Sequence, residues 1–430
     1  MSFRTKFILI LLSATLTLYT VVGGWIATSA QQPANDPNAQ LRIFESVLQH
    51  IQNDYVDEPN MDKVRAGALR GLAYGLDPYS TYLTPEQVRD YNAGNKNNLA
   101  GIGAELSQVA SYLYIIAPMK GSPADQAGLN AGDIIEYIDN KATRDISLYD
   151  AKQLLNGPAG SEVKLRVLRA NSSPLTISVK RGSSRAPAAE SRMEAGRIGV
   201  LRINSFGDGD AAEVRKRLQD LDKQGAQKLV LDMRDTAGGS LTEAAAVANL
   251  FIKDGMIAET IGREGKPLKT YNAEPKDAIF HGPVVALINT GTAGAAEVVA
   301  SALLERNRGQ VVGEKSFGAG TEQQLFQLRG GDGLLLTTVK WATASGKTFL
   351  GEDRAHSGVA PSVEVKSQEV AEAVDPDELT GNDDDELQKP EPGTEKDKAT
   401  PAPAPKAAAE DVQMKKALEL LKDKPAPKAG

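Results

Sequence analysis

The stretch INTGTAGAAEVV, Ile288 to Val299, decides how the largest part of this chain folds. It starts where the apolar run VVALI (284–288) ends, and a short run of this kind is typical of a buried strand. Glycines and other small residues then form a turn, after which Ala295 to Arg306 shows the apolar spacing of a helix. A buried strand that leads directly into a helix predicts a parallel sheet with crossover helices.

The same alternation continues on both sides of this stretch. We expect strands at 197–203, 228–234, 284–288 and 310–314, and helices at 211–224, 241–251 and 295–306. This order predicts a largely parallel α/β core over residues 190–366. Ligands of such sheets bind at the carboxyl ends of the strands, where RDTAGG (234–239) and the turn at 289–297 both lie.

Three further regions surround this core. Apolar residues at helical spacing predict a helical N-terminal region over 36–95, and short β-like runs between glycine-rich turns predict a β-rich domain over 98–183. Residues 367–430 are rich in Asp, Glu, Pro, Lys and Ala, so we expect a disordered tail. Within it, a short helix at 408–423 carries an apolar stripe that is either a docking segment or a transient, solvated helix.

Residues 1–30 have the pattern of an export signal. Arg4 and Lys6 precede an apolar run, and small residues follow at 27–30. Residues 7–26 are also long enough to serve as an uncut membrane anchor. Either outcome places the remaining chain in the periplasm or cell envelope.

Composition excludes several classes of function. A net charge of −7 and a pI near 5.3 disfavour nucleic acid as a partner. The absence of Cys excludes thiol chemistry, and His50, His281 and His356 show no metal-ligand spacing. Ser345 to Thr348 lacks the preceding glycine of a phosphate-binding loop, and the acidic run 382–386 is typical of a solvated tail. We expect no cofactor and no metal.

An ordered series of motifs gives the chain a family resemblance. From about residue 41 to 365 it resembles the carboxyl-terminal processing peptidases, or tail-specific proteases, a family of serine peptidases with a PDZ domain. The motifs are GALRGLAYGLDPYSTYLTPEQ (67–87), GIGAEL (101–106), GSPADQAGLNAGDII (121–135), LVLDMRDTAGGSL (229–241), NTGTAGAAE (289–297), VVGEKSFGAGTEQ (311–323) and GVAPSVEV (358–365). Each motif is weak alone, and their order carries the resemblance.

The resemblance implies that residues 98–183 form the PDZ domain. A PDZ groove binds the carboxylate of a protein's C-terminus through backbone N–H groups and adds the peptide as a strand. The implied binding residues are Gly101, Ile102, Gly103 and Ala104, with Leu106 in the edge strand. The alternative is that the two glycines form only a tight turn.

The resemblance also implies where catalytic residues would stand. Active relatives have a Ser nucleophile and, 25 positions later, a Lys base; here these positions are Gly294 and Ala319, also 25 apart (319 − 294). The implied oxyanion hole, formed by backbone N–H groups near Gly238 and Ala295, needs no side chain, and Gln323 matches the residue that supports the base. We therefore expect a pseudo-peptidase.

Two interpretations of function remain open. In the first, an exported homologue without a Ser/Lys dyad binds C-terminal peptides or unfolded proteins, alone, as a homo-oligomer or beside an active relative, with Met414 to Leu421 as a candidate contact. In the second, an active serine-type endopeptidase uses displaced groups, namely Thr292 or Ser316 with Lys315. Neither His281 nor another His belongs to a recognisable Ser-His-Asp arrangement.

Overall fold

The computed structural model describes residues 37–94, 99–144, 146–367 and 410–422, with Ser13 and Thr17 besides. The chain divides into two compact units, Met1–Ala68 and Leu69–Gly430. The signal or anchor predicted at 7–26 lies outside the described residues apart from Ser13 and Thr17, and the acidic run 382–386 lies wholly outside them. Among the helices that are described, none combines the length and apolar character needed to cross a bilayer.

The first unit is helical where it is described, as predicted. It contains α2 (Pro37–Asp54) and the start of α3 (Met61–Tyr74). Large apolar side chains of α2 are exposed, among them Leu41, Ile43 and Val47.

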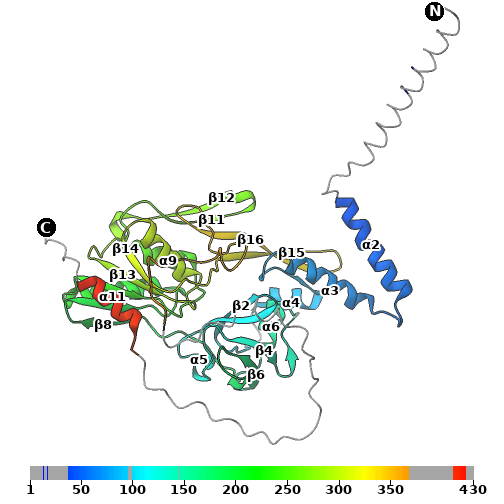
Figure 1. The fold of residues 1–430 in the computed structure, drawn as a ribbon, viewed down its shortest axis with the longest axis horizontal. Coiled ribbons are helices and arrows are strands. Elements are labelled where there is room, and N and C mark those ends of the chain that lie inside the picture. The colour runs from blue at the N-terminus through cyan, green and yellow to red at the C-terminus, as the bar shows by residue number, and fades with distance from the viewer. Residues whose placement is uncertain are drawn as a thin grey trace, which may run out of the picture. The chain divides into compact units, whose positions relative to one another are not determined.

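The second unit contains the predicted parallel sheet (Figure 1). Its strand order is β17-β14-β13-β10-β9-β8, and all neighbours are parallel except β8 and β9. The strands are β8 (Glu190–Glu194), β9 (Ile198–Arg202), β10 (Lys228–Asp232), β13 (Val284–Ile288), β14 (Gly309–Gly313) and β17 (Val363–Glu364). Every residue of β10 and β13 is buried, which explains their unbroken apolar runs.

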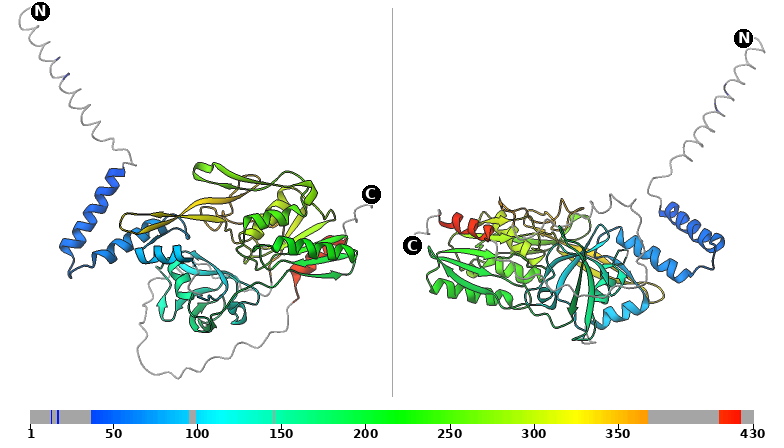
Figure 2. Two further views of the ribbon diagram at one scale, coloured as in Figure 1. Left: turned by 180° about the vertical axis from the view of Figure 1, so that it is seen from behind. Right: turned by 60° about the horizontal axis from the view of Figure 1, so that its bottom comes forward.

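Helices cover both faces of this sheet. The crossover helices α7 (Asp210–Lys223), α8 (Leu241–Asn249) and α9 (Ala295–Glu305) share one apolar cluster with alternate strand residues such as Leu229 and Leu231. The other face, which includes Val230, packs against α11 (Val412–Lys422). Figures 1 and 2 show α11 in red beside the sheet.

This position of α11 settles one alternative and corrects another expectation. The C-terminal segment does contain a short helix, but its apolar stripe docks on the chain's own sheet: Ala417 and Leu421 are fully buried there. Residues 410–422 are therefore part of the folded core and not of a disordered tail. The side chains of Met414, Ala417 and Leu421 are buried against the chain's own sheet and therefore do not offer a surface to another subunit in this arrangement.

The β-rich domain forms a separate antiparallel sheet with the order β2-β3-β4-β6-β7. Its elements are β2 (Ala104–Val109), β3 (Tyr112–Pro118), α5 (Pro123–Gln126), β4 (Ile134–Ile138), β5 (Lys141–Ala142), α6 (Leu148–Leu155), β6 (Glu162–Leu168) and β7 (Leu175–Lys180). They enclose their own apolar core, which includes Leu113 and Leu165. Strand β2 lies at the edge of the sheet, and α6 packs next to it.

A third, antiparallel sheet was not predicted. It joins β1 (Thr81–Leu83), β11 (Met256–Ile261), β12 (Pro267–Asn272), β15 (Thr321–Gln327) and β16 (Gly333–Thr343). Most side chains of β12 and β15 are partly or fully exposed, so these strands lack the apolar runs by which the core strands were found. Helix α4 (Pro85–Ala93) follows β1 and is capped by Thr84 and Gln87, whose side chains each accept the other's backbone N–H.

Candidate functional site

Gly294 lies in the turn between β13 and α9, at the carboxyl edge of the parallel sheet. Its backbone has φ 64° and ψ −116°, a conformation that residues with a side chain rarely adopt. A Cβ added there would come 3.3 Å from the Gly238 carbonyl oxygen, a tight contact that requires the Gly238 loop to shift by a few tenths of an ångström. The turn would therefore present a residue at 294 directly to the Gly238 loop.

Because of this backbone, we expect Gly294→Ala to lower the free energy of unfolding by about 1–2 kcal/mol. Urea unfolding measures the change. Gly71→Ala is the matched control, because Gly71 lies in helix α3 with no atom within 4 Å of an added Cβ, and it should leave stability equal or slightly higher. If the Gly294→Ala variant is as stable as the natural chain, the backbone conformation at Gly294 does not disfavour a side chain.

The buried carboxylate of Glu297 joins the two positions where the family's dyad would stand. Its Oε2 accepts the backbone N–H groups of Gly294, at 2.7 Å, and of Ala319, at 2.9 Å. Its Oε1 accepts the N–H of Gly318 at 2.8 Å and the hydroxyl of Ser316. The structure thus brings Gly294 and Ala319 together, as the 25-residue spacing and the family resemblance suggested.

Burial of Glu297 raises its pKa to about 7, although the four hydrogen bonds act in the opposite direction. The native carboxyl group therefore takes up a proton more readily than the unfolded one. Consequently its contribution to the free energy of unfolding is greatest below about pH 4.5 and falls as pH rises to about 7.

We expect the free energy of unfolding of the Glu297→Gln variant to depend less on pH between about 4.5 and 7 than that of the natural chain. Urea unfolding of both proteins at pH 5 and pH 7.5 measures the difference. A stability gap between the two proteins that stays constant with pH would show that Glu297 does not titrate in this range.

Aromatic and aliphatic residues of the β-rich domain pack against Ala319 and against Ala293, the residue before Gly294. Tyr114 stacks on Phe317 with ring centroids 5.5 Å apart, and Arg354 lies over the same phenyl ring at 4.3 Å. The apolar cluster at this contact consists of Tyr112, Tyr114, Ile116, Ile134, Ala293 and Phe317, with Ala319, Ala237, Val109 and Leu168 packed against it. An alanine at 319 suits this apolar surrounding, whereas a lysine amine would be buried there among apolar side chains.

The expected oxyanion groups are adjacent, but one of them is already paired. Ala295 donates its N–H to the carbonyl of Gly238 at 3.2 Å. Gly238 and Gly239 both have positive φ, and a Cβ on Gly238 would meet the carboxylate of Glu105 on β2 at 3.3 Å. In this arrangement the Ala295 N–H is occupied, and it can bind an oxyanion only after the Gly238 carbonyl moves away.

Gln323 belongs to a hydrogen-bond network that the sequence did not suggest. Its amide donates to Thr321 at 2.8 Å and to Thr337 at 3.1 Å. Thr337 in turn donates to Asp77 at 3.0 Å, and Asp77 also accepts the N–H groups of Tyr79 and Ser80. These hydrogen bonds join the DPYS segment (77–80) to the third sheet. In the sequence, only the Asp-Pro turn of this segment indicated that it has a fixed structure.

The hydroxyl groups considered as displaced nucleophiles are fully buried and bonded. Thr292 donates to the Met233 carbonyl at 3.0 Å, and Ser316 donates to Glu297 and accepts the N–H of Val359. The amine of Lys315 donates to the carbonyl of Ala355.

Histidine does not complete a serine site or a metal site in the part of the chain that the structure describes. His50 and His356 are exposed, and their rings pair with Asp54 at 2.6 Å and Asp353 at 2.7 Å. Among the described residues no group of three or more His, Asp or Glu side chains could hold a metal ion.

The implied carboxylate loop stands directly before the edge strand β2. Gly103 has φ 73°, and the carbonyl groups of Ile102 and Gly103 accept the N–H groups of Ala124 and Met119, both at 2.8 Å. Within the described residues, no acceptor is seen for the N–H groups of Ile102 and Gly103. Lys152 on α6 and Glu105 on β2 form an ion pair at 3.6 Å across the space between these elements.

Comparisons with known proteins identify the family. The chain is 32% identical to the carboxy-terminal processing protease CtpA of Bacillus subtilis over 336 residues, which cover 78% of this chain and 72% of that protein. It is 31% identical to the carboxy-terminal-processing protease of Bartonella bacilliformis, with 89% of this chain and 88% of that protein covered. This chain belongs to peptidase family S41. The profile of this family matches residues 197–365, and a PDZ-domain profile matches residues 114–169.

A solved structure supports the same assignment to family S41. The photosystem II D1 C-terminal processing protease superposes with a TM-score of 0.62 at 26% identity, and 75% of this chain and 92% of that chain are covered. The predicted fold class is thereby confirmed: a helical N-terminal region, a PDZ domain and an α/β S41 core. The chain is a CtpA-like member of family S41 with a PDZ domain.

Proposed function

We propose that this S41 protein binds the carboxyl-terminal tails of other proteins in its PDZ groove and does not cleave them. It acts as an exported pseudo-peptidase in the periplasm or cell envelope, where residues 1–30 direct it. Its partners are C-terminal peptides or unfolded proteins, and an active relative or a second copy could use the bound tail.

One observation carries the absence of cleavage. Glu297 holds Gly294 and Ala319 next to each other, so the chain retains the frame of a Ser/Lys site without a hydroxyl or an amine in it. A serine attacks a peptide bond only when a neighbouring base removes its proton. The hydroxyl groups of Thr292 and Ser316 cannot replace it as they stand, because both are buried and hydrogen-bonded.

The PDZ geometry supports binding of tails. A free edge at β2 can accept a peptide as an additional strand, and the N–H groups of Ile102 and Gly103 precede this edge without an acceptor among the described residues. These groups suit a terminal carboxylate, which accepts several hydrogen bonds. The ion pair between Lys152 and Glu105 is partly exposed and contributes little stability, so a peptide could displace it at small cost.

The test is a titration with one tail peptide in two chemical forms. A peptide with a free C-terminal carboxylate should bind at least about tenfold more tightly than the same peptide with a C-terminal amide, because the amide removes a charged acceptor. Fluorescence anisotropy measures both affinities. Equal affinities would exclude the carboxylate loop and leave a groove that recognises side chains only.

A further inference from the structure

Helix α11 covers one face of the parallel sheet over β10, β13 and β14. The three crossover helices pack on the opposite face, so α11 alone among the described helices contacts Val230, Val285 and Val312. All three valines are fully buried. Removing the helix would expose them, and burying apolar surface is the main favourable contribution to such a contact.

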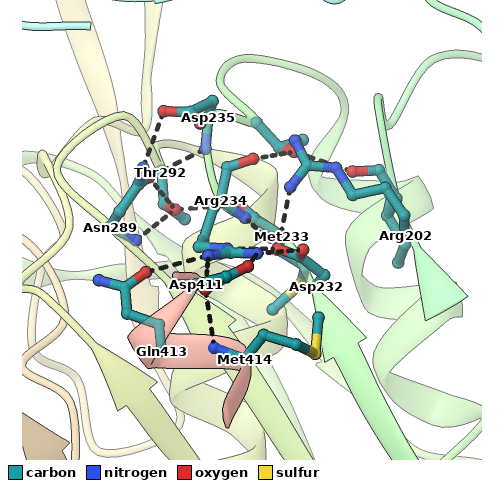
Figure 3. A network of polar contacts seen from close by, with 12 residues as sticks. Arg202, Asp232, Met233, Arg234, Asp235, Asn289, Thr292, Asp411, Gln413 and Met414 are labelled. Atoms are coloured by element: carbon teal, nitrogen blue, oxygen red, sulfur yellow. Dashed lines mark hydrogen bonds and ion pairs between the residues drawn. The ribbon is translucent and has the colours of Figure 1, made fainter. Parts of the chain in front are cut away.

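Polar contacts fix both ends of α11. At its start, Asp411 accepts two hydrogen bonds from the guanidinium group of Arg234, each 2.9 Å long, and also accepts the N–H of Met414 (Figure 3). At its end, the buried amine of Lys228 donates to the carbonyl of Leu421 at 2.6 Å. An acidic residue at the start of a helix and a lysine at its end both suit the helix dipole.

Arg234 also begins the loop that carries Gly238. Its guanidinium group holds Asp232 with contacts of 2.8 Å and 3.0 Å, and Arg202 donates to the same carboxylate at 2.9 Å (Figure 3). Burial alone would raise the pKa values of Asp232 and Asp411, but the hydrogen bonds and the charge of the neighbouring Arg234 outweigh it and lower both pKa values. Both carboxylates are therefore ionised near neutral pH.

The loop is tied on its other side to the turn of Gly294. Asp235 and Asn289 exchange two hydrogen bonds, of 2.9 Å and 2.8 Å. Further along, Ala293 donates its N–H to the carbonyl of Thr236 at 3.0 Å. Contacts are thus continuous from Asp411 through Arg234 and the loop to the turn at Gly294.

We propose that α11 is a tethered latch that positions the Gly238 loop through the Asp411–Arg234 ion pair. The segment that covers this face of the sheet is the chain's own residues 410–422. It is separated from residue 367, at the end of the described core, by 42 residues (409 − 367). Asp411 is a positioning residue in this scheme, since it reaches the loop only through Arg234. This inference goes beyond tail binding and holds whether or not the PDZ domain binds a carboxylate.

Asp411→Asn tests the latch with little disturbance of the helix. Asparagine is as good a residue for the start of a helix as aspartate, but it lacks the charge that pairs with Arg234. We expect amide hydrogen exchange in residues 233–241 and 290–296 to become about tenfold faster or more, while exchange in β4 stays unchanged. The matched control is Glu410→Gln, because Glu410 pairs only with the exposed Lys415 in the described contacts and should change neither segment.

Two further variants test whether the charge at position 411 and the docking of α11 position the loop. Asp411→Glu restores the charge and should return most of the protection, which a purely structural change would not do. Ala417→Asp places a charge in the buried contact and should release α11 completely. If α11 amides exchange freely in this variant while residues 233–241 stay protected, the latch does not position the loop and the proposal is wrong. The proposal is also wrong if amide hydrogen exchange in α11 and in residues 233–241 is the same in the Asp411→Asn variant as in the natural chain.

Discussion

Purified residues 31–430 should leave an unfolded protein substrate intact. Removing the nucleophile of a comparable serine hydrolase slows the reaction by about a million-fold, and here Gly294 and Ala319 supply neither nucleophile nor base. The remaining hydroxyl groups of the site cannot compensate, because Thr292 and Ser316 are fully buried and hydrogen-bonded. Gel electrophoresis over a day should therefore show no new fragments.

The matched experiment restores both side chains. The double variant Gly294→Ser, Ala319→Lys should cut the same substrate, and each single variant, prepared identically, should stay silent and so control for contaminating proteases. Cleavage by the natural chain that disappears in Thr292→Val or Lys315→Ala would show that the chemistry has moved to displaced groups. In that case the pseudo-peptidase interpretation is wrong.

Glu297→Gln should cost about 2–4 kcal/mol of unfolding free energy at pH 7.5. The four groups that surround the carboxylate are all donors: three backbone N–H groups and the hydroxyl of Ser316. A glutamine side chain offers one acceptor oxygen, and its NH2 group would face N–H groups that need an acceptor. The turn at Gly294 and the loop at Ala319 would both loosen.

Urea unfolding monitored by fluorescence measures this loss. The control is Glu213→Gln, which removes a carboxylate from the surface ion pair with Arg217 and should change stability by about 0.5 kcal/mol or less. A Glu297→Gln variant as stable as this control would mean that the carboxylate does not hold the two loops together.

The parallel core was predictable because its strands are buried on both faces. Continuous apolar runs such as Leu229–Leu231 and Val284–Ile288 mark such strands in a sequence, and crossover helices follow them closely. Strands β12 and β15 of the third sheet were missed, since β12 is almost wholly exposed and β15 mixes exposed and half-buried residues, and neither has an apolar run. Each pairs with a strand that is next to it in the chain, β12 with β11 and β15 with β16, so the hairpins are local, but neither strand carries an apolar run that marks it.

The candidate site was predictable in position but not in its surroundings. Spacing and resemblance placed Gly294 and Ala319 together, and the contacts of Glu297 show how they meet. The sequence did not reveal that Tyr114 stacks on Phe317 beside Ala319, because that contact joins two domains. It also did not explain a lysine in a buried strand; Lys228 is there to bind the last carbonyl groups of α11.

The measurement that tests the central claim most directly combines binding and integrity in one sample. A fluorescent tail peptide with a free C-terminal carboxylate is held with an excess of the natural chain, its anisotropy is recorded, and its mass is then determined. We predict raised anisotropy and a peptide of unchanged mass, which means that the chain binds tails without cutting them. A bound peptide that is recovered shortened would contradict the claim, and so would an anisotropy that never rises.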